Sequence, residues 1–382
     1  SPKDNASGNY YRIWDMALDP SNVLYAATDG GLYKTSDRGM SIQSAGFSGK
    51  TVYDIDWDTL GRLVVSTEEG VYRRIASTWE NLSDQLPTKR YYSIHAAPNG
   101  YLYTGTTNTE IYRSTNNGIS WQLKATGIAG TNTSAQSVGK IFSLPNGDLM
   151  AGTSGHSFRS TNQGDTWIKD PELSDVTTIV YYDSDVILLD GNIWRSHDKG
   201  VTFERINTNL GAAYPNDGFI SAAKNSKGEL FIGTVFFGGG GKLFKSPDLG
   251  HTWELINNDG NMHDLACDAM DFLYRSTSTS GLKRSITPVL SVFPQAIPFS
   301  VSIFPNPLAS ECIVRYDLGA DSHVSLTVTN ILGNEVHRLL DEFQSQGSHD
   351  VDLDLSVLSP GQYFVVTTIN GTTHASHISI IR

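Results

Sequence analysis

Cysteine and long apolar runs are both scarce in this sequence. Its 382 residues include two cysteines, Cys267 and Cys312, which excludes a disulfide framework. We expect both to be small buried residues, with an interdomain bridge or a reactive thiol as the alternative. No apolar run approaches the roughly 20 residues that cross a bilayer, so the sequence predicts no transmembrane segment.

Positive charge is also in short supply. The formal net charge is −12, from 28 Lys and Arg against 40 Asp and Glu, and no basic stripe is present. Nucleic acids and anionic membrane surfaces both require clustered Lys and Arg, so neither is an expected partner. The chain opens Ser1-Pro2-Lys3 without Met or a signal peptide, and we expect either a processed exported protein or a trimmed sequence.

What the sequence does contain is turn formers, aromatic residues and a repeat. Its 36 Gly, 17 Tyr and 7 Trp favour many short strands joined by tight turns. An octapeptide recurs that reads small hydroxyl, x, Asp or Asn, x, Gly, x, Ser or Thr, aromatic. Clear copies occupy residues 114–121, 160–167 and 246–253, looser copies occupy 35–42 and 196–203, and a degenerate copy ends at Trp79. Repeats of this length imply one supersecondary unit per copy.

Each copy follows three strand-like segments, which gives four strands per unit of about 40 residues. That pattern is typical of β-propellers. We predict that the second strands of seven units begin at Leu24, Leu63, Leu102, Leu149, Val186, Leu230 and Leu273. The sequence therefore predicts an all-β fold with a seven-bladed β-propeller over residues 1–285, whose last outer strand comes from residues 286–292 or from those before Tyr10.

The composition changes after residue 285. Pro288, Pro294 and Pro298 indicate a linker over residues 286–300. Residues 301–382 contain no Lys and carry a net charge of −6. Alternation over residues 323–328 and 363–366 predicts a small C-terminal Ig-like antiparallel β-sandwich.

The repeat is explained by turn chemistry. Its Asp or Asn side chain accepts backbone N–H groups two or more residues on, its Gly supplies a positive φ, and its Trp anchors the turn. The copies resemble the Asp boxes, or BNR repeats, of bacterial sialidases and related propellers, a resemblance that covers residues 10–285. The resemblance implies that the Asp or Asn of each copy is structural and lies on the rim of the propeller away from the ligand-binding mouth. These residues are Asp37, Asn116, Asn162, Asp198 and Asp248.

The same resemblance raises an enzymatic alternative. Sialidases hold the substrate carboxylate with three arginines and use a Tyr with an acidic partner. Tyr11-Arg12-Ile13 is similar to the start of their Phe-Arg-Ile-Pro motif, with Trp14 in place of the proline. Arg113, Arg159 and Arg195, however, occupy equivalent third-strand positions, which favours rim residues over a converging triad.

A second resemblance concerns the first unit. Residues 25–33 look like the first blade of propeller xyloglucanases, which implies a catalytic role for Asp29. The alternative is that Asp29-Gly30-Gly31 forms a turn between strands.

Other motifs fail on spacing. Asp54, Asp56 and Asp58 open like a calcium loop, but Thr59 and Val65 stand where that loop needs Gly and Glu. Residues 238–242 lack the first Gly and the Ser or Thr of a phosphate loop. In residues 263–268, alternation sends successive ligand-type side chains to opposite faces. We predict no metal site and no cofactor.

The tail carries a more specific signal. Phe304-Pro305-Asn306-Pro307 is followed by motifs at residues 329–336, 358–364 and 378–382. In this order they resemble the C-terminal sorting domain of type IX secretion cargo, with Pro305, Asn306, Pro307, Gly333, Gly361 and Tyr363 as the matching positions. The resemblance implies recognition of residues 301–382 by the outer-membrane export machinery, cleavage in the linker, and a secreted or surface-attached product after periplasmic transit.

The mouth of a propeller is formed by the loops between second and third strands and by those between units. We therefore expect ligand contacts from Asp29, Glu68, Glu69, Glu110, His156, Tyr214, Asp217, Phe236 and Phe237. The leading hypothesis is a noncatalytic module that binds polysaccharide or a surface protein. The alternative is a sialidase-like or xyloglucanase-like glycoside hydrolase, which would require two mouth carboxylates roughly 5–9.5 Å apart. A third hypothesis is an assembly factor similar to the photosystem propellers with such repeats.

Overall fold

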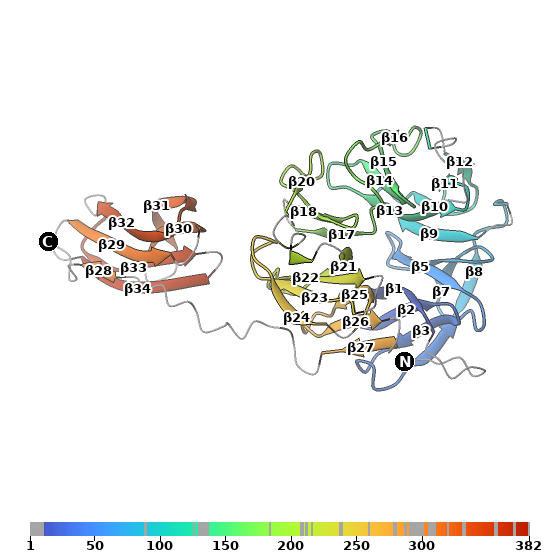
Figure 1. The fold of residues 1–382 in the computed structure, drawn as a ribbon, viewed down its shortest axis with the longest axis horizontal. Helices are drawn as coiled ribbons and strands as arrows, with labels where there is room; N and C mark the ends of the chain where they lie inside the picture. Colours follow the sequence, from blue (N-terminus) through green and yellow to red (C-terminus); the bar gives the residue numbers. More distant parts are fainter. Residues whose placement is uncertain are drawn as a thin grey trace. The chain divides into compact units, whose positions relative to one another are not determined.

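The computed structural model describes residues 11–380 apart from gaps at 88–89, 125–126, 129–136, 183–184, 207–209, 211–212, 215–216, 237–239, 259, 278–280, 286–288, 290–301, 305–310, 319–320, 331–333, 355–357 and 370–371. The chain divides into two compact units, Ser1–Leu290 and Ser291–Arg382. We call them the N-terminal unit and the C-terminal unit, and both are built from β-strands (Figure 1).

In the described part of the N-terminal unit, the strands form seven antiparallel sheets that follow one another along the chain. We number them sheet 1 to sheet 7. Sheets 1 to 3 contain β1 (Ile13–Leu18), β2 (Leu24–Thr28), β3 (Gly31–Thr35), β4 (Gln43–Gly46); β5 (Val52–Trp57), β6 (Leu63–Thr67), β7 (Val71–Ile75), β8 (Thr78–Asn81); and β9 (Tyr91–Ala96), β10 (Leu102–Thr106), β11 (Ile111–Ser114), β12 (Gln122–Leu123). Sheets 4 to 7 contain β13 (Val138–Ser143), β14 (Leu149–Thr153), β15 (His156–Ser160), β16 (Ile168–Lys169); β17 (Thr178–Tyr181), β18 (Val186–Leu189), β19 (Ile193–Ser196), β20 (Glu204–Arg205); β21 (Asp217–Lys224), β22 (Leu230–Phe236), β23 (Leu243–Ser246), β24 (Glu254–Asn257); and β25 (Met262–Cys267), β26 (Leu273–Thr277), β27 (Gly281–Arg284).

The second strands of these sheets are apolar and buried. They begin at the seven residues predicted from the sequence, Leu24, Leu63, Leu102, Leu149, Val186, Leu230 and Leu273. Every residue of β2, β6, β10 and β14 is buried, because both faces of a second strand pack against a neighbouring sheet. Short continuous apolar runs of this kind are what a strand covered on both faces requires.

The first strands, β1, β5, β9, β13, β17, β21 and β25, lie toward the middle of the N-terminal unit (Figure 1). We call them the inner strands. Adjacent inner strands contact each other along the series from β1 to β5, β9 and β13 and from β17 to β21 and β25. β25 also contacts β1, so the last sheet lies beside the first.

Most inner strands contain a bulge one residue after their first paired position. The pairing register shifts between Ile13 and Asp15 and at the corresponding places in five other sheets. The shifts leave one residue of each of these strands without a partner on the second strand: Trp14, Tyr53, Tyr92, Gly139, Ile220 and His263. A bulge re-aims side chains, and this one places aromatic and basic groups together at one end of the inner strands.

Sheet 7 has three strands among the described residues. Both segments predicted to supply its outer strand, residues 286–292 and those before Tyr10, lie almost entirely outside the described part of the chain.

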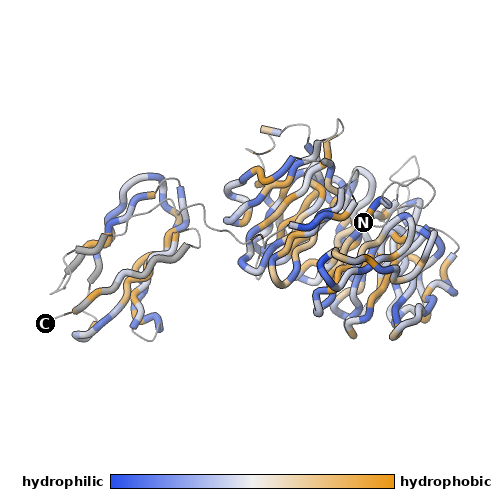
Figure 2. Tube along the Cα trace, turned by 90° about the horizontal axis from the view of Figure 1, so that it is seen from below, coloured by the Kyte–Doolittle hydropathy of each residue, from blue (hydrophilic) through white to orange (hydrophobic). Residues whose placement is uncertain are grey.

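The C-terminal unit contains two antiparallel sheets in its described part. One has the order β28-β29-β32 and the other the order β31-β30-β33-β34. Their strands are β28 (Ser302–Phe304), β29 (Glu311–Leu318), β30 (Ser322–Asn330), β31 (Glu335–Gln344), β32 (Gly347–Asp354), β33 (Gly361–Ile369) and β34 (Thr372–Ile380). The alternation predicted over residues 323–328 is confirmed, because Val324, Leu326 and Val328 are buried and join one apolar core. In both units apolar residues follow the strands and hydrophilic residues gather at the turns (Figure 2).

Of the predicted sorting positions, Gly361 begins β33 and Tyr363 donates its hydroxyl to Ser359 O at 3.1 Å. Pro305, Asn306, Pro307 and Gly333 lie outside the described residues, as does the side chain of Cys312. Cys267 is a free, half-buried thiol whose pKa is raised to about 12 by burial. This side chain fits the expected small packing residue.

Candidate functional site

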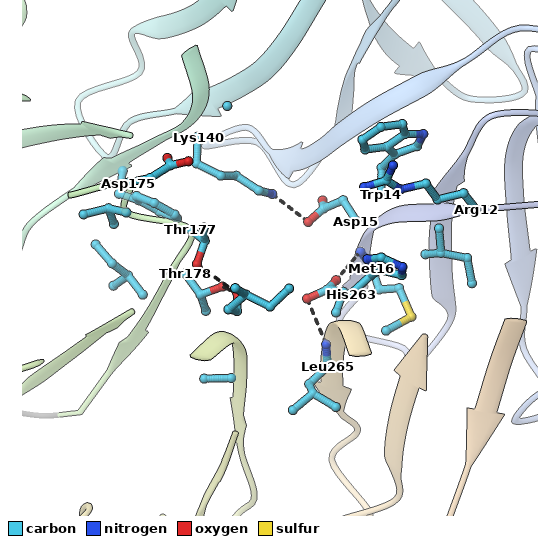
Figure 3. A pocket seen from close by; sticks show the side chains of 18 residues that line it. Arg12, Trp14, Asp15, Met16, Lys140, Asp175, Thr177, Thr178, His263 and Leu265 are labelled. Atoms are coloured by element: carbon cyan, nitrogen blue, oxygen red, sulfur yellow. Dashed lines mark hydrogen bonds and ion pairs between the residues drawn. The ribbon is translucent and has the colours of Figure 1, made fainter. Parts of the chain in front are cut away.

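A cavity of about 400 Å³ lies among the inner strands of the N-terminal unit. Its lining comes from β1, β13, β21 and β25 and from the segment that enters β17. Labelled residues of the lining face one another across it in Figure 3, with Asp15 and Trp14 opposite Lys140 and Asp175. The volume is within the range of ligand pockets in proteins.

One half-buried cation of the cavity lining, Lys140, is held by several acidic groups. Lys140 Nζ lies 2.7 Å from Asp15 Oδ1 and 2.5 Å from Asp54 Oδ1, and it also attracts Asp264. Burial lowers the pKa of Lys140, but the attraction of Asp15 and Asp54 outweighs it and raises that pKa above its ordinary value. The lysine therefore stays charged at any physiological pH.

Three carboxyl groups surround this single ammonium group, so the cluster cannot hold them all ionised at low cost. Burial raises the pKa of Asp15 well above its ordinary value, against the attraction of Lys140 and with repulsion from Asp54 and Asp264. Burial likewise raises the pKa of Asp264 to about 6. Asp15 and Asp264 are therefore protonated more readily than free carboxyl groups are.

The same carboxylates join neighbouring sheets. Asp15 Oδ2 accepts the backbone N–H of Ile55 at 3.0 Å, and Asp54 Oδ2 accepts that of Ile94 at 2.9 Å. Asp264 Oδ2 accepts the N–H of Met16 at 2.6 Å and so connects sheet 7 to sheet 1. Each of these three carboxylates therefore connects two sheets, since it accepts a backbone N–H from the next inner strand.

Trp14 of the cavity lining belongs to a series of contacting aromatic rings. The guanidinium of Arg12 lies 3.8 Å from the centroid of the Trp14 ring. Figure 3 shows these two side chains together. Trp14 packs edge-on against Tyr53 at 5.4 Å, and Tyr53 packs against Tyr92 at 4.7 Å. The indole Nε1 of Trp14 is buried and has no hydrogen-bond partner among the described residues.

Two ionisable groups of the cavity wall have shifted pKa values. Burial raises the pKa of Asp175 to about 7, and repulsion from Asp190 adds to it. Burial lowers the pKa of His263, as does the nearby Arg12. At neutral pH the wall therefore offers a carboxyl group close to half-protonation and a neutral imidazole.

The predicted mouth residues lie elsewhere. None of the eight expected ligand contacts that the structure describes belongs to the lining of this cavity. Tyr214, Asp217 and Phe236 do come together, around the ammonium of Lys242, which lies 2.8 Å from Asp217 Oδ2 and over both rings at 4.9 and 5.8 Å. Phe237 lies outside the described residues.

The other predicted residues are dispersed and engaged locally. Asp29 donates its N–H to Arg12 O at 3.2 Å and attracts the Arg12 guanidinium. Glu68 accepts the N–H of Thr51 at 2.9 Å, and Glu69 forms an ion pair with Lys50. Glu110 accepts the hydroxyl of Tyr112 at 3.2 Å, and His156 begins β15.

Sequence reasoning missed the cavity because it gave weight to loops. A usable signal was nevertheless present, because Asp15, Asp54, Lys140 and Asp264 are charged residues within strand-forming segments that also contain buried apolar residues. Charges in such positions are rarely buried unless they are paired.

The repeated octapeptides form five turns with the same hydrogen bonds, between the third and fourth strands of sheets 1 and 3 to 6. In the turn of residues 35–42, Thr35 Oγ1 donates to Asp37 at 2.8 Å, Ser41 N donates to Asp37 Oδ1 at 2.9 Å, and Gly39 has a φ of 84°. The residues equivalent to Asp37 accept the same two donors in the other four turns: Asn116, Asn162, Asp198 and Asp248.

The third-strand arginines reach the turn of the next sheet. Arg113 donates to Gln163 O at 2.7 Å, Arg159 donates to Val201 O at 3.0 Å, and Arg195 lies 3.5 Å from the His251 ring. Because each arginine is directed to a different turn, these three do not form a carboxylate-binding triad.

The calcium-like spacing over residues 54–58 is also explained locally. Asp54 and Asp56 lie on β5, whereas Asp58 closes a turn through its ion pair with Arg62 at 2.7 Å. Among the described residues, no group of three or more His, Cys, Asp and Glu side chains has the geometry to hold a metal ion.

Residues 302–381 match the family model of the secretion system C-terminal sorting domain. The chain carries a type IX sorting domain. This domain implies recognition by the type IX export machinery and a surface or secreted location. The part of the chain that the structure describes contains no helix of the length and apolarity needed to span a bilayer.

No curated protein matches the sequence. Among solved structures, the extracellular domain of the hybrid two-component system BT3049 of B. thetaiotaomicron is 13% identical with a TM-score of 0.57, over 100% of this chain and 57% of that one. YCF48 bound to D1 peptide is 17% identical with a TM-score of 0.51, over 73% and 93% of the two chains. The WD40 β-propeller domain of Doa1 is 12% identical with a TM-score of 0.50, over 73% and 93%.

At these identities the comparisons show the fold alone. The protein is nearly all β, and its structural neighbours are propeller-like. This chain spans little more than half the length of the B. thetaiotaomicron domain.

Proposed function

We propose that this protein is a module that binds a glycan beside Trp14 in the cavity without cleaving its glycosidic bonds, at the bacterial surface or outside the cell. In this proposal the N-terminal unit is a seven-bladed Asp-box β-propeller, and the C-terminal unit is an Ig-like sandwich read by the export machinery. The seven consecutive sheets, the contact of β25 with β1 and the five matching turns support the propeller.

The observation that carries the proposal is the position of Trp14 at the cavity. Its side chain belongs to the lining of the cavity, and the Arg12 guanidinium lies over its ring. A sugar presents an apolar C–H face for an aromatic ring and hydroxyl groups for polar donors, so it matches such a mixed wall. Asp175 and His263 add further hydrogen-bonding groups to the lining.

A binding role fits the state of the inner carboxylates. Glycoside hydrolysis requires two carboxyl groups that reach the scissile bond from opposite sides. Asp15 and Asp54 are instead bound to Lys140 and to backbone N–H groups. Both carboxylates therefore accept hydrogen bonds that connect neighbouring sheets. Among the described contacts, Asp175 of the cavity lining makes no such bond.

Asp175 is also the observation that favours the second candidate, a glycoside hydrolase. A carboxyl group with a pKa near 7 suits a general acid at neutral pH. The hydrolase would need a second carboxylate across the cavity from it.

One experiment separates the two candidates. The full chain is applied to a glycan array and assayed for hydrolysis of every glycan it binds. Binding without cleavage supports the proposal, and cleavage abolished by Asp175→Asn supports the hydrolase. Trp14→Ala is expected to lower affinity about tenfold, the equivalent of about 1.4 kcal/mol, whereas Trp14→Phe retains an aromatic face.

A protein partner is the other outcome. Loss of all glycan binding in a correctly folded chain, together with saturable binding to one purified surface protein, would replace the glycan by a protein ligand.

Export through the tail has its own test. Deletion of residues 301–382 is expected to leave the N-terminal unit in the periplasm, because the sorting signal is gone. The Trp14→Ala full chain serves as the control and is expected at the surface or in the medium. We also propose that the tail is cleaved within residues 286–300, which the mass of the exported protein checks. Normal delivery of the deletion variant would contradict this role.

A further inference from the structure

A second cluster of functional side chains lies near the carboxyl ends of three successive inner strands. Asp56 is the penultimate residue of β5, His95 the penultimate residue of β9, and Ser143 the last residue of β13. None of the three belongs to the lining of the central cavity. His95 Nδ1 lies 3.0 Å from Asp56 Oδ2, and His95 Nε2 lies 2.7 Å from Ser143 Oγ.

The chemistry of the partners assigns the hydrogens. An ionised carboxylate only accepts hydrogen bonds, so the Nδ1–H of His95 donates to Asp56. In the neutral imidazole the other nitrogen, Nε2, is then an acceptor, and it receives the hydroxyl hydrogen of Ser143. This is the arrangement in which a histidine can remove a proton from a serine while a carboxylate holds its ring.

Each member of the cluster is held by further contacts. Asp56 Oδ2 also accepts the N–H of Ala96 at 2.9 Å, and Asp56 Oδ1 accepts that of Trp57 at 2.7 Å. The His95 ring stacks on buried Tyr103 at 6.5 Å between centroids. The carbonyl of Ser143 accepts the hydroxyl of Tyr181 at 2.7 Å. Rigid support of this kind is what a reacting group needs.

The cluster is also open to solvent. The side chain of His95 is 13% exposed and that of Asp56 is 30% exposed, and Ser143 is half-buried. A reacting serine must be reached by its substrate, and this partial exposure permits that.

We propose that Ser143, His95 and Asp56 form a hydrolytic triad that cleaves carboxylic esters. Ser143 Oγ bonds to the ester carbonyl carbon while His95 Nε2 takes the hydroxyl proton. The carbon–oxygen bond to the leaving alcohol breaks, and His95 gives that alcohol its proton. Water then attacks the acyl-serine by the same route, which releases the acid and restores Ser143. Asp56 is a positioning residue that fixes the tautomer of His95.

A backbone donor is placed beside the nucleophile. Leu144 N donates to Asp148 O at 2.8 Å, and Ser143 pairs with Leu149. Because hydrogen-bonded and non-hydrogen-bonded pairs alternate in an antiparallel ladder, the N–H of Ser143 points away from β14. In this proposal it stabilises the oxyanion, a role that the nucleophile's own N–H plays in other triads.

The triad does not rest on the proposed glycan binding, because it uses other residues and another chemistry. The first test is covalent labelling of the wild-type full chain with a fluorophosphonate probe, followed by mass spectrometry of the labelled peptide. Modification of Ser143 supports the triad. Absence of label, or label at other residues only, overturns it whatever the behaviour of any variant.

The second test is hydrolysis of p-nitrophenyl acetate. Ser143→Ala is expected to remove the activity, and Asp56→Asn is expected to lower it by at least a hundredfold because the imidazole loses its oriented tautomer. Ser226→Ala is the matched control, since Ser226 Oγ also donates to a carboxylate, that of Asp271 at 2.7 Å, and that carboxylate accepts no histidine donor among the described contacts. It is expected to retain full activity.

Chemical rescue distinguishes a base from a packing residue. In His95→Ala the activity is expected to fall at least a hundredfold and to return in part with added imidazole. A variant that folds as the wild type and keeps its hydrolysis rate would refute the role of His95. Melting temperatures of all variants identify those that fail to fold, and labelling of the wild type remains decisive for the proposal.

Discussion

The carboxylate of Asp264 accepts the backbone N–H of Met16 at 2.6 Å, across 248 positions of sequence. Asp15 and Asp54 make the same kind of bond to the next inner strand, to Ile55 and Ile94. The contact between sheet 7 and sheet 1 is therefore built by the same device that joins sheets 1, 2 and 3. A ring needs such a closing contact, because an open end would expose the faces of its first and last sheets.

Asp264→Ala is expected to lower the free energy of unfolding by about 1–3 kcal/mol, since it leaves the N–H of Met16 without its acceptor. Asp264→Asn keeps an acceptor oxygen and is expected to lose less. Denaturant unfolding of the two variants and the wild type measures the difference. Equal losses in both variants would mean that the hydrogen bond contributes nothing to closure.

Lys140→Met is expected to destabilise the protein by about 3–5 kcal/mol at pH 8, because it leaves buried carboxylates without their cation. The loss should shrink at pH 5, since the raised pKa values of Asp15 and Asp264 allow these groups to become neutral. Thermal unfolding at both pH values measures this dependence. Lys50→Met, which removes an exposed ion pair with Glu69, is the control and should cost far less stability than Lys140→Met. A loss in Lys140→Met that does not depend on pH would contradict the raised pKa values of Asp15 and Asp264.

Asp37 and Asp198 are expected to make their turns sensitive to acid. Hydrogen bonds from Ser41 lower the pKa of Asp37 to about 2, and those from Thr202 lower the pKa of Asp198 to about 2. A depressed pKa contributes stability above the unfolded value of 3.8, and this contribution is lost as the pH falls through the folded value. The effect should therefore appear between about pH 4 and pH 2.

The chain provides an internal control for this titration. Ser120 and Thr166 donate to Asn116 and Asn162, which do not titrate. In NMR spectra the amide signals of Ser41 and Thr202 should move between pH 4 and pH 2, and those of Ser120 and Thr166 should stay in place. Asp37→Asn should abolish the shift at Ser41. Parallel movement of all four amides would argue against a local origin.

Asp175→Asn is expected to stabilise the protein at pH 8 and to have little effect at pH 4. Burial raises the folded pKa of Asp175 to about 7, so the folded state prefers the neutral carboxyl and loses stability as the pH rises from about 4 to 7. The gain at pH 8 should be on the order of 2–4 kcal/mol. Melting curves across this range measure it, and Asp217→Asn, which breaks an ion pair with Lys242, should destabilise instead. No gain at alkaline pH would mean that Asp175 is better solvated than its position implies.

Much of the strand pattern could be predicted from the sequence. The second strands begin where the apolar runs begin, at Leu24, Leu63 and their equivalents, because a strand covered on both faces must be apolar throughout. The turn bonds of Asp37 and its equivalents also follow from local spacing, since donor and acceptor are four residues apart. Residues 302–381 were recognisable as a sorting domain because their motifs lie in a fixed order.

The candidate site was not predictable in this way. Asp15 and Asp54 are 125 and 86 positions from Lys140, and nothing in their local sequences couples them. Loop position alone placed Asp29, Glu68 and Glu110 at a mouth, whereas the structure engages each with its own neighbourhood. Tyr214, Asp217 and Phe236 did converge, around Lys242, which loop position alone did not predict.

The sequence by itself therefore determined the strand order, the turns and the sorting domain, because these depend on patterns among residues that are close along the chain. Only the tertiary structure decided which polar side chains meet. The inner strands of sheets 1, 2, 4 and 7 bring Asp15, Asp54, Lys140 and Asp264 together, and those of sheets 2, 3 and 4 bring Asp56, His95 and Ser143 together. The reason is geometric: alternate residues of every inner strand face its neighbours, so charges far apart in sequence become partners once the sheets lie side by side.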